Sequence, residues 1–319
     1  MSNPAAGDTA RRVTVSVAGH GVVGRRLQRN LSASSQIEVV PRDLSGRVVV
    51  LTTPEPHGKM AGDLLAAGTH VVSTTGSLGD VRSLIDLDDA ARSGGAALVV
   101  GAAVSPGLSG LLARHLQRQL ARCDELHVSV HGTAGPACAR EHHRALAGWA
   151  LGWNDGNRIE RAAGSGRELC WFPEPVGAMD CYRAELSDPL LLHRSFADVE
   201  RISARQSATR RDRLTARLPM LSPPHAEGGI GALRVEARGE EASGARATPV
   251  MGVAELLGTA TAAVAAAMVG EIVRRMAADR HRSGVITTSD ADIDLPQVLR
   301  DVVRHGVRLQ SFTGVPTAP

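Results

Sequence analysis

Short apolar runs alternate with amphipathic stretches along the first part of the chain. The runs are rich in Val and predict strands at 13–18, 37–40, 47–52, 69–74 and 96–100. The amphipathic stretches predict helices at 22–31, from 57 to about 67, at 80–93 and at 105–122, with Asp80 and Ser105–Pro106 at helix starts. Strands and helices that alternate with short loops predict an α/β fold built on a doubly wound parallel sheet.

The alternation stops near residue 124. Beyond it, strands are predicted at 125–131, 158–163, 168–172, 199–206 and 232–238, with a helical stretch at 139–152. This pattern predicts an α+β domain with a mostly antiparallel sheet. A polar stretch at 240–248 precedes an Ala-rich helix at 250–273 and a helix at 295–306. The predicted parts are therefore 1–123, 124–247, and a C-terminal part, 248–319, that returns to the first domain.

Composition narrows the class of protein. The apolar stretch 250–273 contains Glu255 and Glu271, which favours a buried helix over a membrane span. Residues 1–12 are polar and do not resemble a signal peptide. Basic and acidic residues are interspersed at a net charge of +3, so no nucleic-acid or membrane partner is expected. The four cysteines lack metal-ligand spacing, which predicts free thiols, no metal site and a cytoplasmic location.

The most informative motif follows the first predicted strand. Gly19, Gly21 and Gly24 form a G-x-G-x-x-G pattern directly before the first predicted helix. In such a unit the first glycine allows a sharp turn, the second lets the backbone approach a pyrophosphate, and the third allows close helix packing. The N–H groups of Val22 and Val23 would face the phosphates. The motif predicts a dinucleotide site; the alternative is a Gly-rich turn that binds nothing.

Other cofactor contacts are expected where neighbouring strands end. Thr52, Thr53 and Pro54 follow the third strand, and Thr75 and Gly76 follow the fourth. In a doubly wound sheet, ligands bind at the carboxyl ends of the strands. These residues are therefore expected to flank the ribose and the nicotinamide.

The residues that would read the adenosine ribose are ambiguous. Arg42 and Asp43 stand about 20 residues beyond the first glycine, where an acid favours NAD and an arginine favours NADP. Arg25 and Arg26 add positive charge, so NADP is preferred, with NAD as the alternative. Only six residues separate the second and third predicted strands, too few for a crossover helix. Either the sheet is trimmed here or one strand is misassigned.

The run Arg140-Glu-His-His-Arg144 is the main candidate for substrate binding. On a helix, Arg140 and Arg144 share one face, with His143 beside Arg140. The two arginines could hold a carboxylate, and His143 could donate a proton near neutral pH. The alternative is an exposed basic helix face.

Three further residues are candidates on weaker grounds. His131 ends the strand that enters the second domain, and Tyr182 could donate to a carbonyl or imine. Glu174 stands between two prolines and could orient a substrate amine. Each of them could equally serve packing or turn geometry.

Several segments, in the same order along the chain, resemble the saccharopine dehydrogenase-like reductases. They are the glycine motif, the strand 68–76, the segment Val99-Val-Gly-Ala-Ala-Val-Ser-Pro-Gly-Leu108, the turn Phe172-Pro-Glu-Pro-Val-Gly177 and the small-residue helix near the C-terminus. The resemblance implies a Rossmann-type domain with an inserted α+β substrate and dimerisation domain. It also implies hydride transfer with a nicotinamide cofactor, and a homodimer. The sequence also shares Thr53-Pro54 and His57 with the glucose–fructose oxidoreductase-like family, but it lacks the Glu-Lys-Pro motif of that family.

The sequence therefore favours an NAD(P)-dependent oxidoreductase acting on a small imine or amino-acid-like carboxylate. The substrate class follows from the resemblance and the arginine pair. One alternative is a catalytically degenerate Rossmann protein that acts as a nucleotide-sensing or partner-binding subunit. A second alternative keeps the redox chemistry but moves it to a double bond in a lipid or natural-product intermediate.

Overall fold

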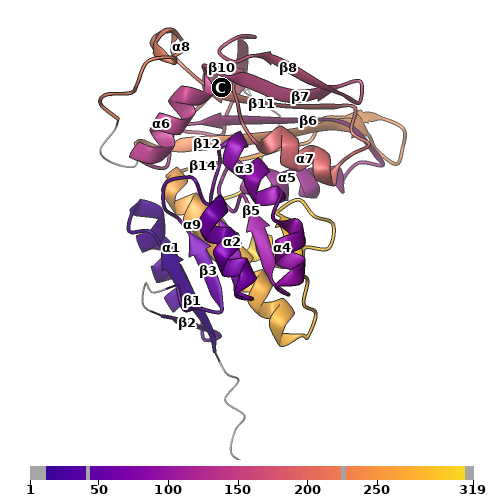
Figure 1. The fold of residues 1–319 in the computed structure, drawn as a ribbon. Helices are drawn as coiled ribbons and strands as arrows, with labels where there is room; N and C mark the ends of the chain where they lie inside the picture. Colours follow the sequence, from indigo (N-terminus) through magenta and orange to yellow (C-terminus); the bar gives the residue numbers. More distant parts are fainter. Residues whose placement is uncertain (1–11, 41–43, 224–227, 313–319) are drawn as a thin grey trace, which may run out of the picture.

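The computed structural model describes residues 12–40, 44–223 and 228–312. Two sheets lie one above the other (Figure 1). The lower sheet has six parallel strands in the order β15-β5-β4-β3-β1-β2. Its strands are β1 (Val13–Ala18), β2 (Ile37–Val39), β3 (Val48–Leu51), β4 (His70–Ser73), β5 (Ala97–Val100) and β15 (Gly284–Thr287). The predicted α/β class is confirmed.

Helices cover both faces of this sheet. Successive residues of β3 point to opposite sides: Val48 and Val50 join one hydrophobic cluster, and Val49 and Leu51 join the other. The helices are α1 (Val22–Ser32) and α9 (Leu257–Ala277) on the first side, and α2 (Gly58–Ala66), α3 (Leu78–Ile85) and α4 (Asp88–Ser93) on the second. Helix α10 (Leu295–Arg304) packs against α9. Burial on both faces explains the nearly continuous apolar strands.

The short connection between β2 and β3 has a structural explanation. The two strands are not neighbours; each pairs with β1, on opposite sides of it. None of the described residues between the two strands is helical, and Gly46 N donates to Ser16 Oγ (3.0 Å) while Arg47 N donates to Thr14 Oγ1 (3.0 Å). Both predicted strands therefore exist, and the sheet is locally trimmed, with β2 as its edge.

The upper sheet has the order β16-β14-β12-β6-β11-β10-β9, with a β7–β8 hairpin beside β11. Only the β6–β11 pair is parallel among the described strands of this sheet, which confirms a mostly antiparallel second sheet. Its strands are β6 (Arg122–His131), β7 (Trp149–Asn154), β8 (Asn157–Ala162), β9 (Glu168–Trp171), β10 (Ala178–Arg183), β11 (Arg201–Ser207), β12 (Gly231–Glu240), β13 (Arg246–Ala247), β14 (Val250–Glu255) and β16 (Gln310–Ser311). The accompanying helices are α5 (Leu108–Gln117), α6 (Pro136–Ala145), α7 (Asp188–Ser195) and α8 (Arg210–Thr215).

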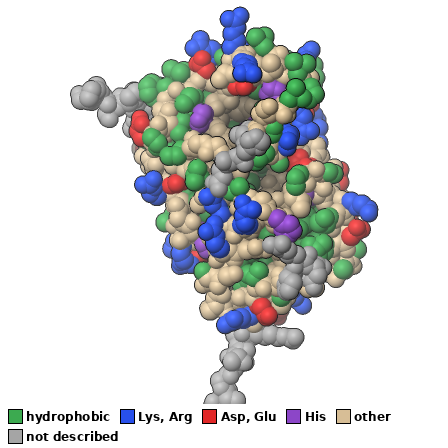
Figure 2. Space-filling view, turned by 90° about the vertical axis from the view of Figure 1, so that its left-hand side faces the viewer, with side chains coloured by type: hydrophobic (Ala, Val, Ile, Leu, Met, Phe, Trp, Pro, Cys, Tyr) green, Lys and Arg blue, Asp and Glu red, His purple; other side chains and the backbone are tan. Residues whose placement is uncertain are grey.

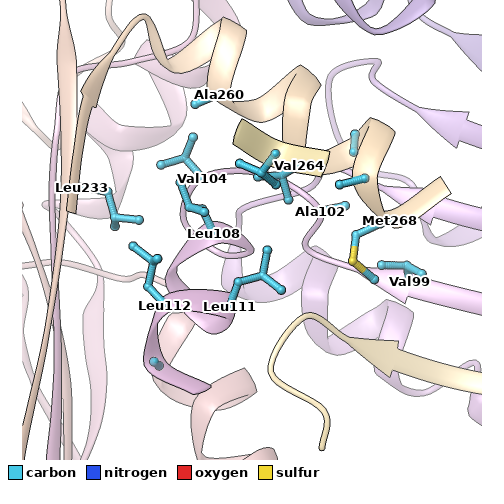
Figure 3. Packing of buried hydrophobic residues seen from close by; sticks show 14 of the residues in the cluster. Val99, Ala102, Val104, Leu108, Leu111, Leu112, Leu233, Ala260, Val264 and Met268 are labelled. Atoms are coloured by element: carbon cyan, nitrogen blue, oxygen red, sulfur yellow. The ribbon is translucent and has the colours of Figure 1, made fainter. Parts of the chain in front are cut away.

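One hydrophobic cluster joins the two sheets. Figure 3 shows Leu108 and Leu111 of α5 beside Val264 and Met268 of α9, with Leu233 of the upper sheet close by. Helix α9 is long and apolar enough to span a membrane, but 83% of its apolar window is buried inside the protein. It is therefore a core helix, and of the two glutamates in the predicted helix only Glu271 lies in it.

Two apolar stretches differ from the prediction. The segment 250–273 is not one helix, because β14 precedes α9. Every residue of β14 except the last is buried, so no polar alternation distinguishes it from a helix. The second sheet thus continues beyond residue 247. Likewise, 139–152 contains the end of α6 and most of β7, where Gly152 allows close approach to the Ile202 carbonyl of β11.

Two predicted helix starts are also wrong. Helix α3 is capped by the Ser77 hydroxyl, which accepts from Asp80 N (3.3 Å), and the Asp80 carboxylate accepts from His57 N (3.0 Å). The predicted single helix 80–93 is two helices, α3 and α4. Helix α5 begins only after Gly107, because the Ser105 hydroxyl donates to Asp188 (2.7 Å) instead of capping it.

Candidate functional site

A cavity of about 570 Å³ lies where the two sheets meet. The lower sheet contributes the glycine turn after β1 and the loops that follow β3, β4 and β5. The upper part contributes α6 and the pair Glu185–Leu186, and α9 contributes Leu257 and Thr261. The antiparallel bridge between Ser77 and Leu186, and the bond from Ser187 Oγ to the Gly76 carbonyl (2.7 Å), connect the two walls. The cavity is thus at the carboxyl ends of the parallel strands.

The glycine turn is shaped by close backbone packing. Gly19 has φ +120°, a conformation that favours glycine. A methyl group on Gly24 would overlap the Gly19 carbonyl oxygen and lie 2.9 Å from Thr52 Oγ1, whereas one on Gly21 would meet nothing within 4 Å. No side chain caps the N-terminus of α1, and its first turn has no acidic residue. The turn therefore leaves open space beside the positive end of the helix.

The loops after β3 and β4 are joined by Glu55. Its carboxylate accepts from Gly76 N and Ser77 N (both 2.9 Å) and from the Thr75 hydroxyl. Burial alone would raise the pKa of Glu55, but these hydrogen bonds outweigh it and leave the pKa below its ordinary value. Glu55 thus stays ionised and holds the two loops together.

A second contact fixes the loop after β3. The buried His57 places Nδ1 2.8 Å from Ser73 Oγ, and its Nε2 donates to the Thr53 carbonyl (2.9 Å). His57 therefore joins the loop that contains Thr53 and Pro54 to β4 and also closes that loop on itself.

Helix α6 forms the opposite wall and exposes four polar side chains to the cavity: Arg140, Glu141, His142 and Arg144. In the part of the chain that the structure describes, none of the four side chains has a hydrogen bond or ion pair with the protein. Figure 2 shows Lys and Arg side chains gathered near the centre of the face on which α1 and α6 lie. Arg140 and Arg144 are exposed at this wall, whereas Glu141 and His142 are half-buried. Since buried polar groups normally have partners, the part of the wall formed by Glu141 and His142 is suited to a polar ligand.

The two central groups of this wall have perturbed acidities. Burial, and then the negative charge of Glu55, raise the pKa of Glu141 to about 8. Burial lowers the pKa of His142, although Glu141 and Asp188 act in the opposite direction. Near neutral pH, Glu141 is therefore largely protonated and His142 largely neutral. A neutral carboxyl group beside an ionised one is an arrangement that supports proton transfer.

Most of the residues predicted for cofactor binding meet at the cavity. Its lining includes Gly19, Gly21, Val22, Val23, Thr52, Thr53, Pro54, Thr75 and Gly76. Gly24 lies beneath the turn, where its missing side chain allows α1 to pack against Gly19. Arg42 and Asp43 lie outside the described residues.

The predicted substrate helix is only partly oriented as expected. Arg140 and Arg144 both line the cavity. His143 is buried on another side of α6, and its Nε2 donates to the Thr215 carbonyl (2.9 Å). Because successive helical residues are about 100° apart, turning His143 toward Thr215 turns His142 toward the cavity. His143 is therefore not placed to donate a proton to a ligand there.

The other three candidates are outside the described lining of the cavity. Tyr182 is buried, with the Arg213 guanidinium 4.1 Å from its ring centroid. The Nδ1 atom of His131 lies 2.7 Å from Ser207 Oγ, and Glu174 is exposed to solvent. The structure does not bring these three side chains together.

Sequence reasoning missed three polar residues of the site: Glu55, Glu141 and His142. Glu141 and His142 belong to the very run singled out as a substrate helix; its two arginines do line the cavity, but His143 was chosen in place of His142. Glu55 follows the strand end of Thr52–Pro54, and its distance from Thr75 along the chain hides their contact. Among the described residues, no cluster of three His, Cys, Asp or Glu side chains is arranged to hold a metal, and all four cysteines are free.

No protein-family model matches the sequence, and no curated protein matches it. Several solved structures are similar in fold. Saccharopine dehydrogenase (L-Glu forming) from Saccharomyces cerevisiae aligns with a TM-score of 0.65 and 13% identity, over 94% of this chain and 100% of that one. DAP dehydrogenase of C. glutamicum in complex with DAP gives 0.51 and 13%, over 93% and 99%. An engineered D-amino acid dehydrogenase bound to NADP+ gives 0.51 and 13%, over 93% and 100%.

These likenesses show a shared fold over nearly the whole chain. The predicted resemblance to saccharopine dehydrogenase-like reductases is confirmed at that level. The fold is a Rossmann-type parallel sheet combined with a second, mostly antiparallel sheet.

Proposed function

We propose that this protein is an NAD(P)-dependent oxidoreductase that transfers a hydride to or from a small imine or amino-acid-like carboxylate. One observation is the main support: the same cavity is lined by a glycine turn suited to a pyrophosphate and by two arginines that have no partner among the described residues. The fold is also shared with amino-acid dehydrogenases, one of them bound to NADP+ and another to DAP.

The glycine turn fits the cofactor. The open space at Gly21 would admit the pyrophosphate, and the N–H groups of Val22 and Val23 at the uncapped helix start would bind it. The loops at Thr52–Pro54 and Thr75–Gly76 would flank the ribose and the nicotinamide. When bound, the cofactor supplies or accepts the hydride.

NADP is the preferred form in this proposal. Arg25 is exposed at the start of α1, and its Nη1 donates to the His20 carbonyl (2.8 Å) beside the glycine turn. A guanidinium in this position suits a phosphate on the ribose better than a free hydroxyl. NAD remains the alternative form. Separate titrations of the protein with NADPH and with NADH distinguish the two.

The arginines of α6 suggest the class of substrate. Arg140 and Arg144 lie one helical turn apart and could hold a carboxylate through charge-assisted hydrogen bonds. The reacting carbon would then lie between α6 and the loop that contains Gly76. Excluding water from this space would favour hydride transfer over side reactions.

The proposal extends to a homodimer in the cytoplasm. Trp149 is 62% exposed on β7 and Leu169 is 55% exposed on β9. Large exposed apolar side chains on the second sheet are suited to contact with a second copy of the chain.

Activity is tested by following the consumption of NADPH with 2-oxo acids and ammonium or primary amines, starting with pyruvate and ammonium. We expect turnover with at least one pair. Tight NADPH binding without turnover by any pair would contradict the proposed reaction. It would favour the catalytically degenerate, nucleotide-sensing alternative.

A further inference from the structure

Glu141 occupies a particular place in the cavity. Helix α6 positions it against the loop after β4, where a methyl group on Gly76 would lie only 3.2 Å from Glu141 Oε1. No described residue gives it a hydrogen bond or an ion pair. Its carboxyl group is therefore available to a ligand that lies between Gly76 and α6, which is where the proposed function places the reacting carbon.

Two neighbouring carboxylates, Glu55 and Asp188, are already engaged, and a third, Glu185, lies against Gly148 and not against Gly76. Glu55 accepts three hydrogen bonds from the 75–77 loop. Asp188 is buried and accepts from the hydroxyls of Ser105 (2.7 Å) and Ser109 (2.5 Å). The oxygens of both carboxylates accept hydrogen bonds from the protein, whereas those of Glu141 accept none from the described residues. Two carboxyl groups in such different surroundings divide into one that stays ionised and one that holds a proton.

We propose that Glu141 is the acid–base catalytic residue of this site. The inference rests on the proposed function. In the reductive direction, the substrate carbon of a neutral C=N or C=O group gains the hydride of a reduced nicotinamide. The π electron pair moves to nitrogen or oxygen, which takes the proton of the Glu141 carboxyl. This leaves a Glu141 carboxylate and an oxidised nicotinamide, and water returns the proton to Glu141. In the oxidative direction, the carboxylate removes that proton.

The charges around Glu141 suit this role. Glu55 from the loop after β3 raises its pKa, as does Cys138 on α6, while His142 and Arg144 lower it. Arg140 of α6 and Glu185, which follows β10, line the same cavity. Burial is the largest influence and brings the pKa of Glu141 to about 8. The group can therefore both give and take a proton near neutral pH.

The kinetic test compares E141Q and E141D with the wild type, and uses E241Q as a control at an exposed carboxylate far from the cavity lining. With NADPH, pyruvate and ammonium, or the most active pair of the screen, E141Q should lower kcat by about 100-fold or more. KM and NADPH affinity should stay unchanged, and E141D should be intermediate. Wild-type kcat should fall above a pH of about 8, and this limb should be missing in E141Q.

Three kinetic results would overturn the proposal: full kcat in E141Q, persistence of the alkaline limb in E141Q, or loss of that limb in H142N instead. Infrared difference spectra of the cofactor-free protein give a separate reading. Wild type minus E141Q should show a protonated carboxyl at pH 7 that disappears above about 8. If the enzyme turns over but this band is absent, only the role of Glu141 is rejected, and the proposed function stands. The band without turnover by any pair rejects the proposed function, and the catalytic role with it.

Discussion

The two walls of the cavity are built in different ways. The glycine turn is mainly a backbone structure: Gly19, Gly24 and the start of α1 are close in sequence, and Gly24 packs directly against the Gly19 carbonyl. The wall formed by α6 depends on side chains, and its orientation depends on distant contacts. His143 is held by Thr215, 72 residues away, and Gln206 Nε2 donates to the His142 carbonyl (2.6 Å) across 64 residues.

In the proposed function, the glycine turn binds the cofactor, and the side chains of α6 bind the substrate and transfer the proton. A wall of backbone N–H groups suits a phosphate, which every nicotinamide cofactor presents in the same form. A wall of side chains without protein partners can be altered residue by residue to suit a substrate. Substitutions in the turn should therefore affect cofactor binding or folding, and substitutions in α6 should affect the substrate and the proton.

The largest effects are expected when a methyl group is added to Gly24 or, in a separate variant, to Gly21. G24A should destabilise the protein by about 1–3 kcal/mol, because the added atom overlaps the Gly19 carbonyl. G21A has open space around it and should leave the unfolding curve unchanged. It should weaken NADPH binding by about 100-fold, equivalent to about 2.7 kcal/mol, because the pyrophosphate needs that space.

Denaturant unfolding and NADPH titration of both variants measure these effects. Loss of stability in G21A would contradict the open space around Gly21. NADPH affinity equal to wild type in that variant would show that this space is not a phosphate site.

The next effect concerns the arginines of α6. R140A and R144A should each raise KM for a carboxylate substrate about tenfold or more, because a hydrogen bond to a charged group contributes about 1.5–3 kcal/mol. NADPH affinity should not change. R211A, at an exposed arginine of α8 outside the described cavity lining, is the matched control. Equal KM values in all three variants would place the carboxylate elsewhere.

The third effect is a pH dependence of stability. The pKa of Glu141 is about 8 in the folded protein against an ordinary value of 4.5, so the folded state binds the proton more tightly. Its contribution to stability is complete below about 4.5 and is lost as the pH rises through about 8, at about 1.4 kcal/mol per pKa unit. E141Q should lack this loss. If the unfolding free energies of wild type and E141Q change with pH in the same way, this prediction is wrong.

The smallest effect distinguishes the adjacent histidines. H143A removes the bond to the Thr215 carbonyl and should lower stability by about 1 kcal/mol, with kcat and KM unchanged. H142A should change kcat or KM and leave stability unchanged. The His142 ring faces the cavity and has no hydrogen bond to the described protein. Thermal unfolding and steady-state kinetics on the two variants decide this. The opposite pattern would mean that His143 is the residue facing the ligand.

The sequence predicted the parallel sheet well because local patterns determine it. Buried strands of Val, short loops and the glycine motif all act within a few residues. The strand at 250–255 was missed because it is buried on both sides and continues into an apolar helix. The burial of His143 away from the cavity was missed because a contact with Thr215 decides it, and no pattern within 139–152 records that contact.

The β2–β3 connection lies between these cases. The sequence showed that no crossover helix fits, and left open whether the sheet is trimmed or a strand misassigned. Only the pairing of both strands with β1 resolves this. The ribose contacts of Arg42 stay a prediction, because that residue lies outside the described part of the chain.

Titration of the purified protein with NADPH and, separately, NADH, followed by nicotinamide fluorescence, tests the central claim most directly. The glycine turn and the cavity predict micromolar binding of one form, with NADPH preferred, and loss of that binding in G21A. If a folded sample binds neither form, the cavity is not a nicotinamide site, and the proposed oxidoreductase function is wrong.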